Sequence, residues 1–443
     1  MQLIRRLYFT RFFYYALAAA TGGFVLAFLF PAFLLLVKVL FAVFVLAVVV
    51  DGAALFNRGE GLVARRTMAE KLSNGSDNPI FIYLENRYPF AVWAEVIDEL
   101  PFQFQKRDAS FGLRLPKKEN QVLEYSLRPV RRGLYDFGAL NVLVNGPLQL
   151  VRRRYRFGQS HSVAVYPSFI QMRQYELLAA SRRLTELGIK KVRQLGHSQE
   201  FEQIRPYVAG DDQRTINWQA SARKAELMVN HYQDEKSQQV YCLIDKGRVM
   251  QMPFEGLSLL DYAINASLVL ANIALRKKDK AGIVTFSDTI GSILPAEGKV
   301  SQIQKILDLL YNQKTRFLET DFEKLYITVR SKIRQRSLLL LFTNFETLSG
   351  ARRQLPYLRK LSRHHLLLVV FFENTETRAL LQTPVTNTEE IYLKAIAEKF
   401  AYEKRQIVKE LSQHGIQSVL TPPEKLTVNT INKYLEFKAR GLI

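Results

Sequence analysis

The chain has 443 residues, of which 48% are hydrophobic and 23% are charged. This length predicts two to four domains, and this composition excludes a largely disordered chain. Lys and Arg outnumber Asp and Glu by 62 to 41, a formal net charge of +21, which favours an anionic neighbour without choosing between nucleic acid, acidic lipid and an acidic protein. The single cysteine, Cys242, excludes an intramolecular disulfide and any site built from paired cysteines.

Residues 1–55 contain a long apolar run. From Phe12 to Val50 only Lys38 is charged. A single helix of that length would reach roughly 58 Å, well beyond the roughly 30 Å hydrocarbon core of a bilayer. Pro31 divides the run into residues 12–30 and 32–50, each long enough to cross. We therefore expect two transmembrane helices forming a hairpin. A cleaved signal peptide would have a shorter apolar core.

Cations flank both sides of this hairpin and predict its orientation. They are Arg5, Arg6 and Arg11 before it, and Arg58, Arg65, Arg66 and Lys71 after it. By the positive-inside rule, the N-terminus and the soluble part should lie in the cytoplasm. A transporter would place partnered ionisable groups at mid-membrane, so we expect the hairpin to serve only as an anchor.

Residues 56–167 read as a β-sandwich-like domain. Short apolar or alternating runs, such as Ile80–Leu84, Ala91–Ile97 and Leu140–Val144, are separated by turn residues. The arginines at 152, 153, 154 and 156 form a cluster near its end. They could face anionic lipid headgroups, or they could be a solvated strand edge that charge protects from aggregation.

Residues 237–443 predict an α/β domain. Apolar strands are expected at 240–244, 281–286, 338–342, 366–372 and 416–420, and amphipathic helices near 257–278, 300–312, 322–334, 352–363, 389–414 and 428–438. Continuous apolar strands alternating with helices are typical of a doubly wound parallel sheet that is covered on both faces.

Catalytic motifs are not found, and we expect the chain not to be an enzyme. It has no phosphate-binding loop, no H-E-x-x-H and no G-x-S-x-G. Ser221 and Lys224 satisfy S-x-x-K, a pattern short enough to arise by chance. His364 and His365 open an apolar strand, which would send their side chains to opposite faces.

Polar residues follow two of the predicted strands, where ligands bind in open α/β sheets. Asp245 and Asn344 each come directly after an apolar strand, and Thr320 with Asp321 opens a helix that could reach the same rim. Oxygen ligands grouped in this way could hold Mg²⁺. In the other interpretation, Asp245 is a strand-end carboxylate paired with Lys, Arg or backbone N–H groups.

A sheet whose first strand ends in Asp resembles a von Willebrand factor A domain. That family binds a divalent ion through D-x-S-x-S, a Thr and a further Asp. In this chain Gly247 and Val249 stand at the two serine positions, and Asn344 stands where the last Asp would be. The resemblance therefore implies a degenerate site of Asp245, Thr320 and Asn344, and we expect neither a metal nor another cofactor there.

Residues 168–236 contain the most specific pattern in the chain. It runs from Glu200-Phe201 through Ile204-Arg205-Pro206-Tyr207 and Gly210-Asp211-Asp212 to Ile216-Asn217-Trp218 and Ser221-Ala222-Arg223. It closely resembles the signature of the bacterial domain of unknown function 58 family, whose members join a membrane hairpin, a β-rich region and an A-type domain. The resemblance implies a protein of the bacterial cytoplasmic membrane that acts with a MoxR-type AAA+ ATPase to assemble or activate client proteins.

The signature interleaves cations and carboxylates beside aromatic rings, which predicts a rigid charged network. Its candidate partner-binding residues are Arg205, Tyr207, Asp211, Asp212, Arg214, Trp218 and Arg223. The network could fix the connection between the two soluble domains, or part of it could be exposed and dock an ATPase or a client.

A membrane-anchored, protein-binding adaptor is therefore the preferred function. Two alternatives stay open: a nucleic-acid-binding membrane protein, suggested by the net charge, and an enzyme that uses a divalent ion at the sheet rim. The cationic surplus is scattered and no nucleic-acid-binding signature accompanies it, so we expect no nucleic-acid partner.

Overall fold

The computed structural model describes residues 6–57, 59–106, 109–158, 160–180, 199–234, 237–382, 384 and 387–442. It is a mixed α/β structure that divides into two compact units, Met1–Tyr166 and Pro167–Ile443. Two of the flanking cations, Arg5 and Arg58, lie outside the described residues.

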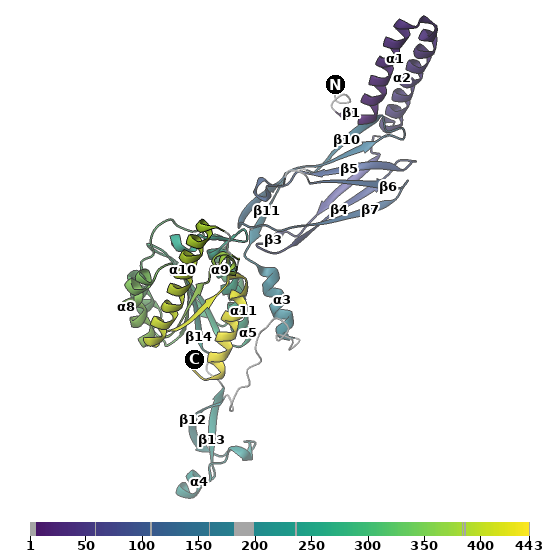
Figure 1. Cartoon of the computed structure of the whole chain (residues 1–443). Coiled ribbons are helices and arrows are strands. Elements are labelled where there is room, and N and C mark those ends of the chain that lie inside the picture. The colour runs from purple at the N-terminus through teal and green to yellow at the C-terminus, as the bar shows by residue number, and fades with distance from the viewer. Residues whose placement is uncertain are drawn as a thin grey trace. The chain divides into compact units, whose positions relative to one another are not determined.

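Two apolar helices lie side by side at the N-terminus, α1 (Arg11–Leu29) and α2 (Leu34–Phe56) (Figure 1). The short 3-10 turn between them begins at Pro31, whose missing N–H and fixed φ suit the start of a helix. The helices touch through aromatic rings, with the Phe24 and Phe41 centroids 5.6 Å apart. The break at Pro31 is as predicted, but α2 continues past the predicted end at Val50.

Three described helices are long and apolar enough to cross a membrane: α1, the segment Pro31–Phe56 and α5 (Leu259–Arg276). The first two are almost entirely uncovered by the rest of the protein, whereas α5 is mostly buried in the second unit. The exposed apolar surface of the N-terminal helices is consistent with membrane anchoring.

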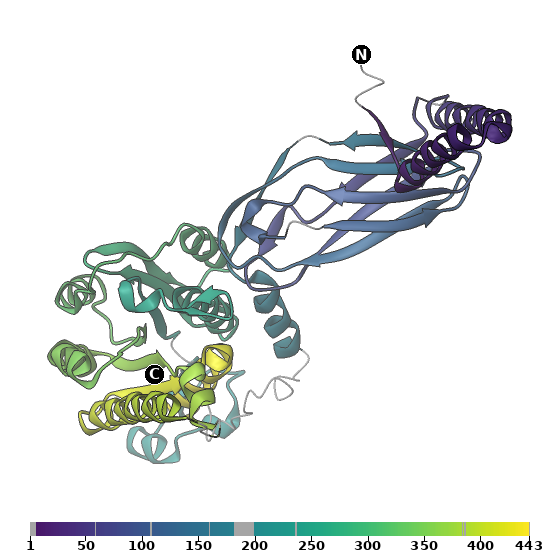
Figure 2. The ribbon, with the colours of Figure 1, turned by 45° about the horizontal axis from the view of Figure 1, so that its top comes forward.

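The first unit contains three sheets. The largest has the order β1 (Leu7–Phe9), β10 (Val151–Phe157), β9 (Leu140–Asn145), β5 (Val92–Asp98), β6 (Ser110–Leu115). The second is β2 (Leu62–Thr67), β4 (Asn78–Asn86), β7 (Asn120–Leu127), and the third is β3 (Lys71–Ser73), β11 (His161–Tyr166), β8 (Gly133–Phe137). Alternate residues of the two larger sheets, including Ile82, Leu84, Val96 and Val142, share one core, and Figure 2 shows the long strands that carry them.

A buried carboxylate ties α2 to the turn between β9 and β10. Asp51 is fully buried and accepts hydrogen bonds from the backbone N–H groups of Leu148, Leu150 and Val151 at 2.8–2.9 Å. A Cβ at Gly146 would lie 2.2 Å from the Asp51 carboxylate, so only glycine fits there. Asp51, which directly follows the apolar run that ends at Val50, thus attaches α2 to this turn.

The arginine cluster of β10 is neither a sheet edge nor uniformly exposed, because β10 pairs with β1 on one side and β9 on the other. Arg153 is 4% exposed and donates to the backbone oxygens of Leu55 at 2.6 Å and Gly59 at 2.8 Å. It therefore caps the Leu55 carbonyl in the last turn of α2, where a cation also complements the helix dipole. The interpretation as a solvated strand edge is therefore wrong for Arg153.

The second unit is built on a six-stranded sheet. Its order is β18 (Ile290–Glu297), β17 (Lys280–Phe286), β14 (Gln239–Asp245), β19 (Leu338–Phe342), β20 (Leu366–Phe372), β21 (Gln417–Thr421). The last five strands are parallel, which confirms each predicted apolar strand, and β18 is an antiparallel edge strand that the sequence did not predict.

Helices cover both faces of this sheet. One face packs against α7 (Phe322–Lys332), α8 (Leu348–His364) and α10 (Thr388–Gln413). The other contacts α5, which in turn packs against α3 (Phe169–Ala180), α6 (Gln302–Tyr311) and α11 (Leu426–Ala439). A short helix, α9 (Thr375–Gln382), was not predicted. His364 ends α8 and His365 caps it, so the two histidines do not open β20 as expected.

The signature folds as an antiparallel hairpin of β12 (Gln199–Pro206) and β13 (Met228–Asp234). The short helix α4 (Trp218–Lys224) lies in the connection between these strands.

Candidate functional site

Asp245 lies fully buried at the carboxyl end of the central strand β14. Its Oδ1 accepts hydrogen bonds from the Thr320 hydroxyl at 2.6 Å and the Gly247 N–H at 2.8 Å, and its Oδ2 accepts one from the Thr343 hydroxyl at 2.7 Å. Burial raises the pKa of Asp245, and these hydrogen bonds oppose the rise. The strand-end carboxylate is thus held by two threonines and one amide, and not by Lys or Arg.

This arrangement does not fit the divalent-ion site that the resemblance suggests. The threonine hydroxyls donate directly to the carboxylate oxygens that would face a metal. A Cβ at Gly247 would lie 2.0 Å from the Thr320 Oγ1, which leaves no room for a serine ligand. Within the described ranges, no three His, Cys, Asp or Glu side chains group as metal ligands. That the chain binds neither Mg²⁺ nor another cofactor here stays a prediction.

Asn344, the third candidate metal ligand, is turned toward α10. Its side-chain oxygen accepts a 2.6 Å hydrogen bond from the Lys404 ammonium. Burial lowers the pKa of Lys404 to about 8. The structure therefore brings Asp245 and Thr320 into contact but gives Asn344 a different partner.

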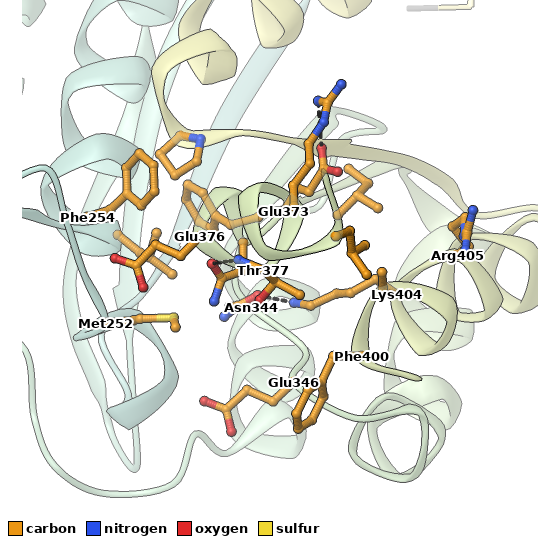
Figure 3. Close-up of a pocket in the computed structure, with 18 of the residues that line it drawn as sticks. Met252, Phe254, Asn344, Glu346, Glu373, Glu376, Thr377, Phe400, Lys404 and Arg405 are labelled. Carbon is orange, nitrogen blue, oxygen red and sulfur yellow. Dashed lines mark hydrogen bonds and ion pairs between the residues drawn. The ribbon is translucent and has the colours of Figure 1, made fainter. Parts of the chain in front are cut away.

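Two pockets open at this end of the sheet. One of about 440 Å³, with polar and apolar walls in similar measure, is lined by residues that include Asp245, Thr320, Asn344 and Glu346. A second, of about 460 Å³, shares Asn344 and Glu346 with the first and extends over Lys404 toward α9 and α10 (Figure 3).

The polar residues of the signature build the hairpin itself. Arg205 pairs with Asp211 at 2.6 Å, and Asp211 also accepts from the backbone N–H of Val208 at 3.0 Å. Asp212 accepts from the Arg214 N–H at 3.0 Å and so caps a 3-10 turn. The half-buried Tyr207 donates its N–H to the Leu227 carbonyl at 2.7 Å.

Two further signature residues fix α4. The Asn217 side chain caps the helix by accepting from the Ala220 N–H at 3.0 Å and also donates to Asn230 at 2.9 Å. Ser221 donates to the Asn217 carbonyl at 2.8 Å and accepts from the Met228 N–H at 2.8 Å. The hydroxyl of Ser221 is therefore used in holding α4 to β13.

The fixed hairpin leaves other signature residues exposed. Trp218 is 70% exposed at the start of α4, and Val208 is 60% exposed in the connection from β12. Arg214 and Arg223 are exposed as well. The predicted network is thus divided: one group of side chains shapes the hairpin, and a Trp and two Arg side chains face outward.

Sequence reasoning missed two residues of the rim. Thr343 directly follows β19, next to the chosen Asn344, and its position after an apolar strand was the same signal. Lys404 gave no signal, because it is one of several lysines on a long amphipathic helix and its contact with Asn344 spans 60 positions.

Comparisons with known proteins agree with the signature. Residues 203–382 match the family described as "Protein of unknown function DUF58". The "Uncharacterized protein YeaD" of Bacillus subtilis (strain 168) is 27% identical over 238 residues, which cover 52% of this chain and 57% of that relative. The match thus spans little more than half the length of that relative.

Similar solved structures share little with the chain. The conserved hypothetical protein BatB from Bacteroides thetaiotaomicron covers 46% of this chain and is itself covered fully, at 12% identity and a TM-score of 0.30. The CARDB domain of the PF1109 protein from Pyrococcus furiosus covers 24% of this chain and is 86% covered, at 13% identity and a TM-score of 0.17. Likenesses this weak do not bear on fold or function.

The signature from Gln203 onward and the strands from β13 to β20 lie inside the matched region. Residues 203–382 thus match the DUF58 family of proteins of unknown function, which agrees with the resemblance of the signature.

Proposed function

We propose that the protein is a membrane-anchored adaptor that binds other proteins through the β12–β13 hairpin. It acts with a MoxR-type AAA+ ATPase in assembling or activating client proteins, at the cytoplasmic face of the bacterial inner membrane. The observation that carries the proposal is the exposed Trp218, held on a hairpin whose polar residues bond to one another.

An exposed Trp on a hairpin that also carries exposed Arg side chains is suited to protein recognition. Trp and Arg are enriched among the residues that dominate interface energies, because each buries a large area and Arg also forms bidentate pairs. Trp218 is held by the Asn217 cap of α4, so its backbone is already ordered before binding. Pre-ordering lowers the entropic cost of forming a complex.

The proposal also includes the kind of ATPase and the type of α/β sheet. The ATPase comes from the family resemblance of the signature. A von Willebrand factor A-like sheet is supported by the order of its strands, with β14 central and Asp245 at its carboxyl end beside Thr320.

Affinity capture from crosslinked native membranes tests the adaptor function. The tagged full-length chain should enrich an AAA+ ATPase, and Trp218→Ala should reduce its recovery more than tenfold, because loss of a central interface residue costs about 2 kcal/mol or more. The matched control is Trp93→Ala, which removes the other tryptophan of the chain, 48% exposed on β5. Absence of an ATPase under several nucleotide conditions, or equal recovery with Trp218→Ala, would contradict the proposal.

A further inference from the structure

The second pocket at this end of the sheet differs in location and in chemistry from the hydrogen-bond cluster around Asp245. It lies between the β15–β16 hairpin (Pro253–Phe254 and Leu257–Ser258), the ends of β20 and β21, and helices α9 and α10. Figure 3 shows the side chains of these elements converging on it. Much of its wall is apolar, and the apolar residues include Met252, Phe254, Leu259, Leu381, Phe400 and Leu420.

A cation lies inside this apolar pocket. Lys404 reaches from α10 toward Asn344, and its ammonium donates to the amide oxygen at 2.6 Å (Figure 3). An ammonium has three N–H donors, and this bond uses one. Among the described residues, no carboxylate lies within 4.0 Å of it. The amide of Asn344 is neutral, and the attraction of Glu346 for the ammonium offsets only part of the effect of burial on Lys404.

The other charged groups of the pocket lie at its opening. They are Glu346, Glu373, Glu376, Arg378 and Arg405. Glu346, Glu376, Arg378 and Arg405 are exposed, and Glu373 is 4.0 Å from Arg378. Water screens exposed charges, whereas burial strengthens the field of Lys404 within the pocket. We therefore expect the Lys404 end of the pocket to favour an anion, although Glu346 offsets part of its charge.

An exposed apolar stripe on α10 leads into this pocket. Tyr392, Ile396 and Phe400 follow one another at four-residue intervals and so lie on one face of the helix, with Leu393 beside them. All four are large apolar side chains left exposed, and Phe400 also lines the pocket. Lys404 is the next residue in the same series. The surface thus runs from the apolar stripe to the half-buried ammonium of Lys404.

We propose that this pocket binds the C-terminus of a partner polypeptide, with the last, apolar side chain against the apolar wall and the terminal carboxylate on Lys404. The residues before it lie along the α10 stripe. This proposal deepens the adaptor function and rests on it. A C-terminal residue is the part of a protein chain that joins an apolar side chain directly to a carboxylate, which matches a pocket that is both apolar and cationic.

The test uses the full-length protein in lipid nanodiscs and a peptide probe. The probe is Gly-Ser-Ala-Leu-Leu-Phe with fluorescein at its N-terminus, compared with the same peptide ending in an amide, and binding is read from fluorescence polarisation against empty nanodiscs. We expect the acid form to bind at least tenfold more tightly than the amide at pH 7. Lys404→Met should abolish this difference, and Lys409→Met, which removes an exposed lysine of the same helix, should preserve it.

The pH dependence gives a second measurement, which needs no variant. The acid form requires a charged Lys404, whose pKa is about 8 before binding. The preference for the acid form should therefore be complete below pH 7 and decline as the pH rises above about 8. A bound carboxylate favours the ammonium, so some preference persists beyond that value. This profile keeps the proposal testable even if Lys404→Met does not fold.

Several outcomes would overturn the proposal: equal binding of acid and amide, no binding of either, or a preference that Lys404→Met leaves unchanged. Decanoate binding in place of the peptide would also overturn it, by assigning the pocket to a small apolar acid. Trp218→Ala should leave peptide binding unchanged. Failure of the peptide assay is therefore distinguishable from failure of ATPase capture through the hairpin.

Discussion

At the scale of single residues, the sheet rim shows how a metal-site pattern can become a closed hydrogen-bond cluster. Asp245 retains the position expected of a metal ligand, but the hydroxyls of Thr320 and Thr343 satisfy both of its oxygens. Gly247 makes this possible, because its lack of a side chain lets Thr320 approach the carboxylate. The cluster joins three loops, so Asp245 stabilises this end of the sheet.

We predict that Asp245→Ala destabilises the rim far more than Asp245→Asn. Alanine leaves two hydroxyls and one amide without their acceptor, which should cost about 2–4 kcal/mol. Asparagine keeps one acceptor and removes the buried charge. Because burial raises the pKa of Asp245 in the folded state, stability is lost as the pH rises from the unfolded-state pKa to the raised folded-state pKa, and asparagine avoids this loss.

Hydrogen exchange of the full chain, followed by mass spectrometry of peptides covering β14 and the next loop, measures this difference. Alanine should increase local exchange more than tenfold and asparagine less than threefold. Similar exchange in both variants would show that the hydrogen bonds to Asp245 contribute little.

At the scale of elements, the sequence predicted the buried strands well and the exposed ones poorly. Leu338–Phe342 is continuously apolar and fully buried, so pattern and structure agree. The edge strand β18 contains Pro295 and Gly291 and has only half-buried or exposed residues, so it lacks the apolar signal of a central strand. The β12–β13 hairpin was missed because its charged residues suggested a network, and antiparallel pairing of two polar segments leaves no period in the sequence.

The candidate site was only partly predictable for a related reason. Residues directly after apolar strands, such as Asp245 and Asn344, could be chosen from their position alone. Contacts between distant segments could not. Arg153 was noticed as one of several arginines, but its role at the end of α2 depends on a carbonyl 98 positions away.

We predict that Asp51→Asn loosens the attachment of α2 to the β9–β10 turn. The asparagine side chain has one acceptor oxygen where the carboxylate has two. At least one of the three N–H groups bound by Asp51 therefore loses its partner. Exchange at Leu148–Val151 should rise about tenfold, and Gly146→Ala should act in the same direction by displacing the carboxylate. The control is Asp77→Asn, at an exposed aspartate of the same unit. Unchanged exchange with Asp51→Asn would contradict this role.

At the scale of the whole molecule, the two units carry different parts of the proposed function. Met1–Tyr166 contains the apolar hairpin, and Pro167–Ile443 contains the signature and both rim pockets. The orientation of the hairpin then decides which compartment the binding surfaces can reach.

We predict that the Pro31–Phe33 turn faces the outside and that residues after α2 face the cytoplasm. Single-cysteine labelling can test this because Cys242 is buried and burial raises the pKa of its thiol to about 12, which suppresses its reactivity. A membrane-impermeant maleimide should label Ala32→Cys in intact cells and Glu60→Cys only after lysis. The reverse pattern would place the soluble units outside.

The bonds that Asp51 and Arg153 make across the base of the hairpin have a mechanical consequence. Both ends of the membrane segment are fastened to the same sheet, since β1 precedes α1 and pairs with β10 while α2 ends against Arg153. If these helices cross a bilayer as proposed, a change in bilayer thickness that tilts them would turn strands β9 and β10 as well, because Asp51 bonds directly to the β9–β10 turn. The thickness of the bilayer would then set the orientation of the first unit relative to the membrane.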